Sequence, residues 1–344
     1  MKKINNGNNK KFLKKIFIKI CRILGYEIID QSEFYVPTQK KSLNENLSLH
    51  GKKSIAIPLG ETKITRKVNA LTVIFRSCTQ VNMLTQSKKR LFDEIKSEYT
   101  FRSLNSIIAS LINAKKVLPN VKFNIIVIDH NSGQKDLEII RKKLTTSGLD
   151  NSIIPLNVSE FKDKIKKINA ENKNVTENQI SNMSNIYKSL LIAKDQCNDL
   201  IYFVEDDYLH QLNAIEEMIF TYERIASQIM NELVLCPTDY PYLYSKMEAT
   251  NIFFGSSMHW RTTDESLCTF LTSSKIIDKH WHTFISMCQY EHYPFEQPLH
   301  NIYKSEYCLS PMPSIALHFT NINSIYGLSP GVDWKKIWND NKNY

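Results

Sequence analysis

Several features that place a protein in a class at once are missing from this 344-residue sequence. No two cysteines stand at CxxC spacing, and the seven cysteines are an odd number scattered along the chain. This pattern argues against a disulfide framework and for free thiols in a reducing compartment. Internal repeats and low-complexity tracts are also absent, and the length suits one large α/β domain or two small ones.

Acidic residues are missing from the first 26 positions, which hold eight basic side chains. This segment supplies +8 of the formal net charge of +9, so the nearly neutral remainder does not favour nucleic-acid binding. Apolar residues recur at helical spacing on one side of this segment, and basic residues lie on the opposite side, with Ile18 as the exception. The apolar residues on the first side are Phe12, Leu13, Ile16, Phe17, Ile20, Ile23 and Leu24.

This basic amphipathic pattern predicts that residues 1–26 contact an anionic membrane surface. The apolar stretch is short and interrupted by lysines, so neither a transmembrane span nor a secretory signal is expected. We therefore expect a cytoplasmic protein that is peripherally associated with the inner face of the membrane. Docking of the helix onto the protein's own body and RNA binding are the alternatives.

Strand and helix patterns alternate from about residue 69 onward. Apolar runs predict buried strands at 69–75, 123–129 and 200–204. Apolar residues at helical spacing predict intervening helices at 101–111, 137–144 and 181–193. This order predicts a parallel, doubly wound α/β sheet with right-handed crossovers. Later in the chain we expect helices at 215–229 and 276–287, a strand at 314–318, and a hairpin with arms at 251–260 and 266–273.

Three consecutive carboxylates, Glu205, Asp206 and Asp207, directly follow the third apolar run. In open α/β sheets, ligands bind beyond the carboxyl ends of the strands. Carboxylate oxygens are hard ligands that suit Mg²⁺ or Mn²⁺, and such a metal commonly holds a phosphate. Runs of surface carboxylates are usually only solvated, but the position directly after a buried strand favours a metal site here.

A second polar turn lies earlier in the chain. The expected strand 123–129 ends at Asp129 and is followed by a turn, and a later helix carries Asn182 and Asn185. Together with residues 201–207, this order resembles a GT-A glycosyltransferase and is most similar to the large bacterial family 2 type. The resemblance covers residues 69–210. It implies an α/β fold with a GT-A-like, Rossmann-like doubly wound mixed sheet that is flanked by helices.

The resemblance also implies roles for residues at the strand ends. Asp207 matches the direct ligand of Mn²⁺ or Mg²⁺, Glu205 belongs to the same motif, and His318 fits a further metal ligand. The nucleotide sugar is implied to contact Arg76, Ser77, Asp129, Asn185 and Asp206. Plainer explanations exist for some of them, because Asp129 could cap a turn and His318 could be an ordinary core histidine.

The acceptor side is less defined by the sequence. Glu296 resembles the family's Glu-Asp motif that ends in the catalytic base, but Gln297 stands where the family has Asp. This departure leaves the base open. Asp239, Asp264 and Glu265 also lie in the acceptor half and could serve, because an inverting enzyme needs a carboxylate to deprotonate the acceptor hydroxyl. The Trp260-Arg261 pair suggests a surface for sugar stacking, for which core packing is the alternative.

The expected function is a metal-dependent transfer of sugar from a nucleotide-sugar donor to a glycan or lipid-linked acceptor, in bacterial cell-surface polysaccharide synthesis. A sugar-nucleotide nucleotidyltransferase is the first alternative. It usually has a glycine-rich, lysine-containing loop after the first strand, whereas residues 76–80 contain no glycine. A catalytically degenerate glycan-binding or scaffold protein is the second alternative. The intact motif Glu205–Asp207 argues against it, and the missing Asp at position 297 argues for it.

The expected organisation has five parts. They are a membrane-surface helix at 1–27, a linker at 28–67 with a short strand near 54–57, a nucleotide-sugar-binding half at 68–212, an acceptor-binding half at 213–330 and a C-terminal tail at 331–344.

Overall fold

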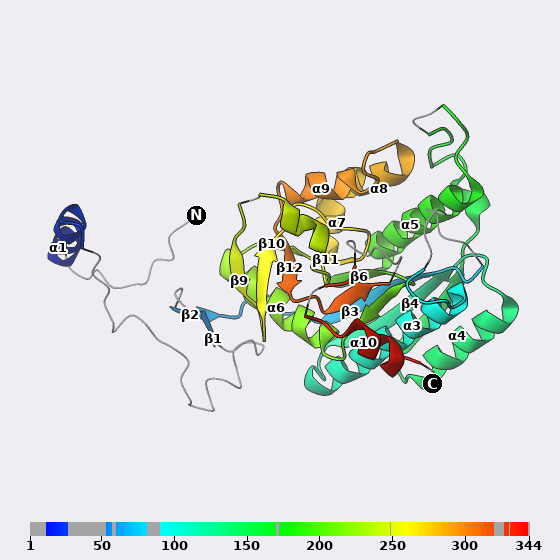
Figure 1. Cartoon of the computed structure of the whole chain (residues 1–344), viewed down its shortest axis with the longest axis horizontal. Coiled ribbons are helices and arrows are strands. Elements are labelled where there is room, and N and C mark those ends of the chain that lie inside the picture. Colours follow the sequence, from blue (N-terminus) through cyan, green and yellow to red (C-terminus); the bar gives the residue numbers. More distant parts are fainter. Residues whose placement is uncertain are drawn as a thin grey trace.

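A large mixed sheet forms the centre of the computed structural model, which describes residues 12–26, 53–56, 60–80, 90–169, 172–247, 249–319, 327–329 and 331–342. Within these residues, nine strands pair in the order β5-β4-β3-β6-β11-β8-β12-β10-β9 (Figure 1). The sheet includes strands from both expected halves of the chain, so the boundary near residue 212 does not separate two independent sheets. The expected α/β architecture, a mixed sheet flanked by helices, is confirmed.

Four adjacent strands of this sheet run parallel. They are β3 (Ala70–Ser77), β4 (Lys122–Asp129), β5 (Asp150–Pro155) and β6 (Leu200–Glu205). The pairing register sets Ser77 beside Asp129 and Arg76 beside Glu205. Because parallel strands end at the same edge of a sheet, their polar terminal residues meet at that edge.

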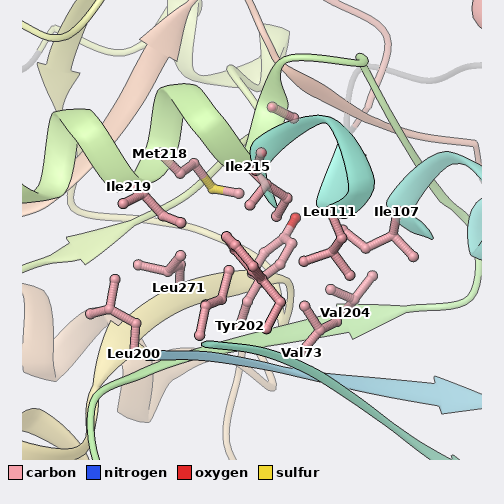
Figure 2. Close-up of a cluster of buried hydrophobic side chains, with 14 of the residues drawn as sticks. Val73, Ile107, Leu111, Leu200, Tyr202, Val204, Ile215, Met218, Ile219 and Leu271 are labelled. Atoms are coloured by element: carbon pink, nitrogen blue, oxygen red, sulfur yellow. The ribbon is translucent and has the colours of Figure 1, made fainter. Parts of the chain in front are cut away.

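Helices cover both faces of the sheet (Figure 1). On one face lie α3 (Lys96–Val117), α4 (Gln134–Thr146) and α6 (Ala214–Ile229). On the other lie α5 (Glu177–Gln196), α7 (Ser274–Lys279), α8 (Trp281–Gln289) and α9 (Gln297–Tyr303). Figure 2 shows the first of these interfaces, where Ile107, Ile215 and Met218 pack onto Val73 and Val204. Alternate strand residues therefore point into two separate cores, which fixes the strand register.

The antiparallel part of the sheet differs from the expected hairpin with arms at 251–260 and 266–273. Instead, β9 (Ile252–Phe254) pairs with β10 (His259–Thr262), whereas β11 (Phe270–Ser273) lies between β6 and β8 (Val234–Leu235). The strand of this sheet that comes latest in the chain is β12 (Cys308–Met312), which lies between β8 and β10. The hairpin prediction is wrong because the buried β11 pairs with distant strands, which local residue patterns do not reveal.

Two short strands lie outside the main sheet and prove central to the site. β7 (Tyr208–His210) pairs antiparallel with β13 (Ala316–His318), so that His318 is opposite Tyr208. The segment expected as a C-terminal tail contains α10 (Trp334–Asp340). Its Trp338 is buried against Phe92 and Phe319, with ring centroids 4.2 and 5.7 Å away. The last described helix therefore packs directly beside β7 and β13.

The remaining described elements are short. They are α1 (Phe12–Ile23), β1 (Lys53–Ala56) paired with β2 (Gly60–Lys63), and the 3-10 helices η2 (Val158–Phe161) and η3 (Pro241–Ser245). The short strand expected near 54–57 corresponds to β1. Among the described residues, no helix combines the length and apolar character needed to cross a membrane.

Candidate active site

Asp207 and His318 face each other where β6 passes into β7. The Asp207 Oδ2 atom lies 3.3 Å from His318 Nε2. Two contacts fix this geometry: the Phe319 N–H donates to the Asp207 carbonyl at 2.8 Å, and the His318 ring stacks on Tyr208 with centroids 4.5 Å apart. The β7–β13 pairing therefore brings together a carboxylate and an imidazole that are far apart in the sequence.

The charges around Asp207 keep its carboxylate ionised. Burial by itself would raise the pKa of Asp207, but the charges of His318, Lys96 and Arg90 outweigh burial and hold this pKa well below its usual value. An ionised carboxylate beside an imidazole is a donor set that a divalent cation can use. The sequence resemblance assigned both residues to a metal, and the structure places them within reach of one ion.

The ligand types of Asp207 and His318 bear on whether Mn²⁺ or Mg²⁺ would bind between them. Among the described residues, no group of three histidine, cysteine or acidic side chains is arranged to hold a metal. If Asp207 and His318 bind a cation, phosphate oxygens and water would complete its coordination, as is common for cations that bind with a phosphate substrate. Mg²⁺ strongly prefers oxygen ligands, so the imidazole nitrogen of His318 favours Mn²⁺.

Asp206 has a different environment from Asp207. Its carboxylate accepts hydrogen bonds from the Cys78 N–H at 3.0 Å and the Thr100 hydroxyl at 2.8 Å, and it forms an ion pair with Lys96. These contacts join the end of β3, the first turn of α3 and the end of β6. The sequence resemblance assigned Asp206 to the nucleotide sugar, and in the structure the Cys78 N–H, the Thr100 hydroxyl and Lys96 hold its carboxylate in place. No local pattern in the sequence identifies Lys96 and Thr100 as these partners.

Arg76 and Glu205 form a second charged pair at the sheet edge, in which Arg76 is buried and Glu205 is partly exposed. Arg76 Nη2 lies 2.8 Å from Glu205 Oε1, and Nη1 donates to Asn182 Oδ1 at 3.1 Å. Arg76 was assigned to the nucleotide and Glu205 to the metal motif. In this structure each neutralises the other, and the pair lies next to the Asp207–His318 pair without belonging to it.

Hydroxyl groups surround Asp129 at the ends of β3 and β4. The hydroxyls of Ser77 and Ser132 both donate to Asp129 Oδ1, at 2.6 and 2.5 Å. The Thr79 N–H donates to the Ser132 hydroxyl at 3.0 Å, and the Gly133 N–H donates to the Thr79 hydroxyl at 3.2 Å. These bonds join the two strand-end loops into one polar cradle, which we call the Asp129 cradle. It is formed by Ser77, Thr79, Asp129, Ser132 and Gly133.

Asn185, which was also assigned to the nucleotide sugar, lies beneath the cradle. Its side-chain N–H₂ group donates to the Ile128 carbonyl at 3.2 Å, and Asn185 is almost fully buried. It therefore fastens α5 to the end of β4. Asn182, three residues earlier on the same helix, is the one whose side chain reaches the site through Arg76.

Glu296 directly precedes α9 as its N-cap residue. Burial and the charge of Glu205 raise the pKa of Glu296 to about 7, against the lowering effects of a backbone hydrogen bond and of the charges of His318 and Arg76. Glu296 thus interacts electrostatically with members of both charged pairs. A carboxyl group with a pKa near neutrality is well suited to take up a proton during catalysis.

Asp239, the second candidate base, is completely buried. Arg261 donates to its Oδ1 through Nε at 3.1 Å and Nη2 at 2.8 Å, and the Tyr244 hydroxyl donates to its Oδ2. Both oxygens are therefore engaged by protein groups, which does not suit a base that must reach an acceptor hydroxyl. The structure assigns Asp239 to a buried ion pair instead.

Comparisons with known proteins give structural neighbours only. No family model and no curated protein matches the chain. Among solved structures, S. aureus TarS (residues 1–349) aligns with 61% of this chain and 48% of its own, at 11% identity and a TM-score of 0.33. This chain thus spans about half of that one.

Two further neighbours span a larger share of both chains. The galactosyltransferase LgtC, in complex with donor and acceptor sugar analogues, aligns with 79% of this chain and 95% of its own at 10% identity (TM-score 0.34). A UDP-glucose pyrophosphorylase complexed with UDP-glucose covers 79% and 98% at 5% identity (TM-score 0.38). At these identities and TM-scores the neighbours carry no functional argument, so the function must be argued from the site.

The Gly327→Ala variant tests whether the chain around His318 is fixed by close packing. A Cβ atom at position 327 would overlap the carbonyl oxygen and the Cβ of His318, so alanine must displace that strand. We expect Mn²⁺ binding in the presence of UDP to weaken by about tenfold, as is usual when the support of a ligand is disturbed. Water-proton relaxation enhancement measures this binding.

Gly331→Ala is the matched control in the same segment. A Cβ there meets no atom within 4 Å, and its only cost is backbone strain at φ +78°. Equal losses of Mn²⁺ affinity in the two variants would show that general destabilisation, and not displacement of His318, is responsible.

Proposed function

We propose that this chain is a metal-dependent glycosyltransferase that moves a sugar from a nucleotide-sugar donor to a glycan or lipid-linked acceptor. One observation carries the proposal: an ionised Asp207 paired with His318 lies at the same sheet edge as the polar Asp129 cradle. A diphosphate joins a sugar to a nucleoside, so the donor needs a cation site and a polar nucleoside site side by side. We place the activity in bacterial cell-surface polysaccharide synthesis.

The donor side of the reaction follows from these contacts. Asp207 and His318 would hold Mn²⁺, and when bound the cation stabilises the negative charge that develops on the leaving diphosphate. The Asp129 carboxylate and the hydroxyls around it offer acceptors and donors for a ribose or a base. Arg76 and Glu205 neutralise each other beside the cation, so Arg76 does not compete with it for the phosphates.

The acceptor side needs a group that removes a proton from the attacking hydroxyl. Glu296 is half-buried, is close to the donor-side charges and has a pKa of about 7, so it can accept that proton near neutral pH. The replacement of the family's Asp by Gln297 does not remove this carboxylate. We assign the base to Glu296, and not to the enclosed Asp239.

A nucleotidyltransferase is the competing enzyme class. It would use the same metal and nucleoside sites, but it would transfer the nucleoside monophosphate group of a nucleoside triphosphate to a sugar phosphate and release pyrophosphate. The loop after β3 contains Cys78, Thr79 and Gln80 and no glycine that would let the backbone approach a triphosphate closely. Incubating the protein with nucleoside triphosphates and sugar 1-phosphates distinguishes the classes, because only a nucleotidyltransferase releases pyrophosphate.

The Asp207→Ala variant tests the cation site. Wild-type protein should turn over one of the UDP-, GDP-, dTDP- or CMP-sugars in the presence of Mn²⁺, and the variant should lose at least about a hundredfold in kcat/KM because the metal loses its ionised ligand. The control is Asp163→Ala, which removes a carboxylate that is 92% exposed and pairs with Lys167 on the surface. Unchanged turnover by Asp207→Ala, with circular dichroism confirming the fold, would refute the metal assignment.

The Glu296→Gln variant tests the base through its pH dependence. The carboxyl group must be ionised to accept a proton, and its pKa is about 7, so kcat/KM should fall about tenfold for each pH unit below 7. Glutamine has the same shape but no basic oxygen. We expect kcat to fall on the order of a hundredfold and to lose this acidic limb, while the affinity for the donor is retained. An unaltered pH–rate profile in the variant would identify another group as the base.

The membrane surface is the partner that we propose for α1. Side chains of the apolar face are exposed, among them Phe17, Ile20 and Ile23. The sequence places basic residues opposite this face, and anionic headgroups attract such residues while the apolar face enters the acyl boundary. Attachment to the inner leaflet would bring the site close to lipid-linked acceptors.

Vesicle sedimentation tests this partner. Full-length protein should sediment with phosphatidylglycerol-containing vesicles, less so at high salt, and deletion of residues 1–26 should abolish the binding. The double variant Phe17→Ser/Ile20→Ser should weaken the binding by at least about tenfold, because it removes buried apolar area. The control Ile18→Ser removes an apolar side chain from the basic side and should bind like wild type. Persistent binding after the deletion would refute α1 as the anchor.

A further inference from the structure

Tyr244 combines two properties that rarely occur together. It lies on η3, just after β8, and its side chain is 56% exposed. Nevertheless its hydroxyl donates a hydrogen bond to the fully buried Asp239. Burial and the neighbouring Asp239 raise the pKa of Tyr244 to about 12, so the hydroxyl keeps its proton and continues to donate. The ring is therefore held in one orientation while much of it remains open to solvent.

A buried ion pair supports this ring from below. Arg261 forms a two-pronged contact with Asp239, and its guanidinium carbon lies 5.8 Å from the Tyr244 ring centroid. Removing two charges from water is costly, and replacing such pairs by apolar residues often stabilises a protein. Joining the segment between β8 and η3 to β10 does not by itself require an exposed tyrosine next to the pair. The arrangement has the properties of a preorganised aromatic surface.

The short helix that carries Tyr244 begins beside the candidate active site. At its start the hydroxyls of Tyr240 and Tyr208 are hydrogen-bonded at 2.8 Å, and the Tyr208 ring stacks on His318. Tyr244 therefore lies on a segment that starts next to the Asp207–His318 pair.

The same helix ends at a charged pair. Lys246, its C-cap residue, forms an ion pair with Glu265 and lies 5.5 Å from the ring centroid of Tyr242.

Trp260, the neighbour of Arg261 in the sequence, does not take part. The sequence suggested a sugar-stacking surface at Trp260-Arg261, but Trp260 is completely buried and its indole N–H donates to Glu217 at 3.1 Å. Core packing, the alternative explanation, applies to Trp260. Only Arg261 reaches this surface, and it does so through Asp239 and Tyr244.

We propose that Tyr244 is a stacking platform for a pyranose ring of the acceptor, with Glu265 and Lys246 hydrogen-bonding its hydroxyl groups. A sugar ring has an apolar C–H face and a hydroxyl-bearing edge, and an exposed aromatic ring on the same short helix as the Lys246–Glu265 ion pair offers partners for both. The inference rests on the proposed function, and it adds that the acceptor is a carbohydrate that is recognised at η3. Tyr244 is a binding residue here and does not take part in the proton transfer.

Saturation-transfer NMR with simple sugars tests the platform. The probes are the methyl glycosides of glucose, galactose and N-acetylglucosamine, added to full-length protein with Mn²⁺ and UDP. At least one glycoside should receive saturation at its ring C–H protons. Tyr244→Leu should weaken binding by about two- to tenfold, the range that an aromatic contact usually contributes. Tyr244→Phe keeps the ring and should bind better than Tyr244→Leu.

Tyr290→Leu is the matched control, because Tyr290 is 63% exposed but lies at the end of α8, away from the Asp239–Arg261 pair. The platform is refuted if no glycoside binds the wild type, if Tyr244→Leu binds as well as wild type, or if both leucine variants lose binding equally. Calorimetric titration of the same samples with UDP and Mn²⁺ checks the donor site separately. If the wild type does not bind UDP and Mn²⁺, the proposed function is refuted. If it does bind them but no glycoside binds, only the platform is refuted.

Discussion

The buried carboxylate of Asp206 is the interaction on which the candidate site depends. It accepts hydrogen bonds from Cys78 and Thr100 and pairs with Lys96, so one side chain joins β3, α3 and β6. A buried carboxylate is costly unless such donors surround it, and removing one donor exposes that cost. Asp206 thereby anchors the end of β6. Asp207, the next residue, faces His318 because the Phe319 N–H donates to its carbonyl and β7 pairs with β13.

The charges at the sheet edge are arranged in pairs. Arg76 neutralises Glu205 and Lys96 neutralises Asp206, so Asp207 is the carboxylate whose partner, His318, is itself a metal-ligand type. This pairing explains how adjacent acidic residues can serve different purposes. A cation would add charge where the site has an ionised carboxylate and an imidazole, and it would leave the two neighbouring ion pairs intact.

Much of the fold could be predicted from the sequence, because the buried parallel strands are nearly continuous apolar runs and the helices have clear periodicity. The edge strand β5 was missed because its residues are mostly exposed and have no such run. The site was only partly predictable. The motif 205–207 was found, but adjacent Asp206 and Asp207 look identical in a sequence, and their different roles depend on partners such as Lys96 and His318 that are distant in the chain. Asp239 likewise looked like a possible base until its buried ion pair with Arg261 was seen.

Pulsed electron paramagnetic resonance of Mn²⁺ bound together with UDP tests the central claim most directly. If Asp207 and His318 hold the cation on a diphosphate, the spectrum should show coupling to an imidazole nitrogen and to phosphorus. The nitrogen coupling should disappear in the His318→Ala variant. Phosphorus coupling without any nitrogen coupling in the wild type, or nitrogen coupling that persists in His318→Ala, would contradict this account of the site.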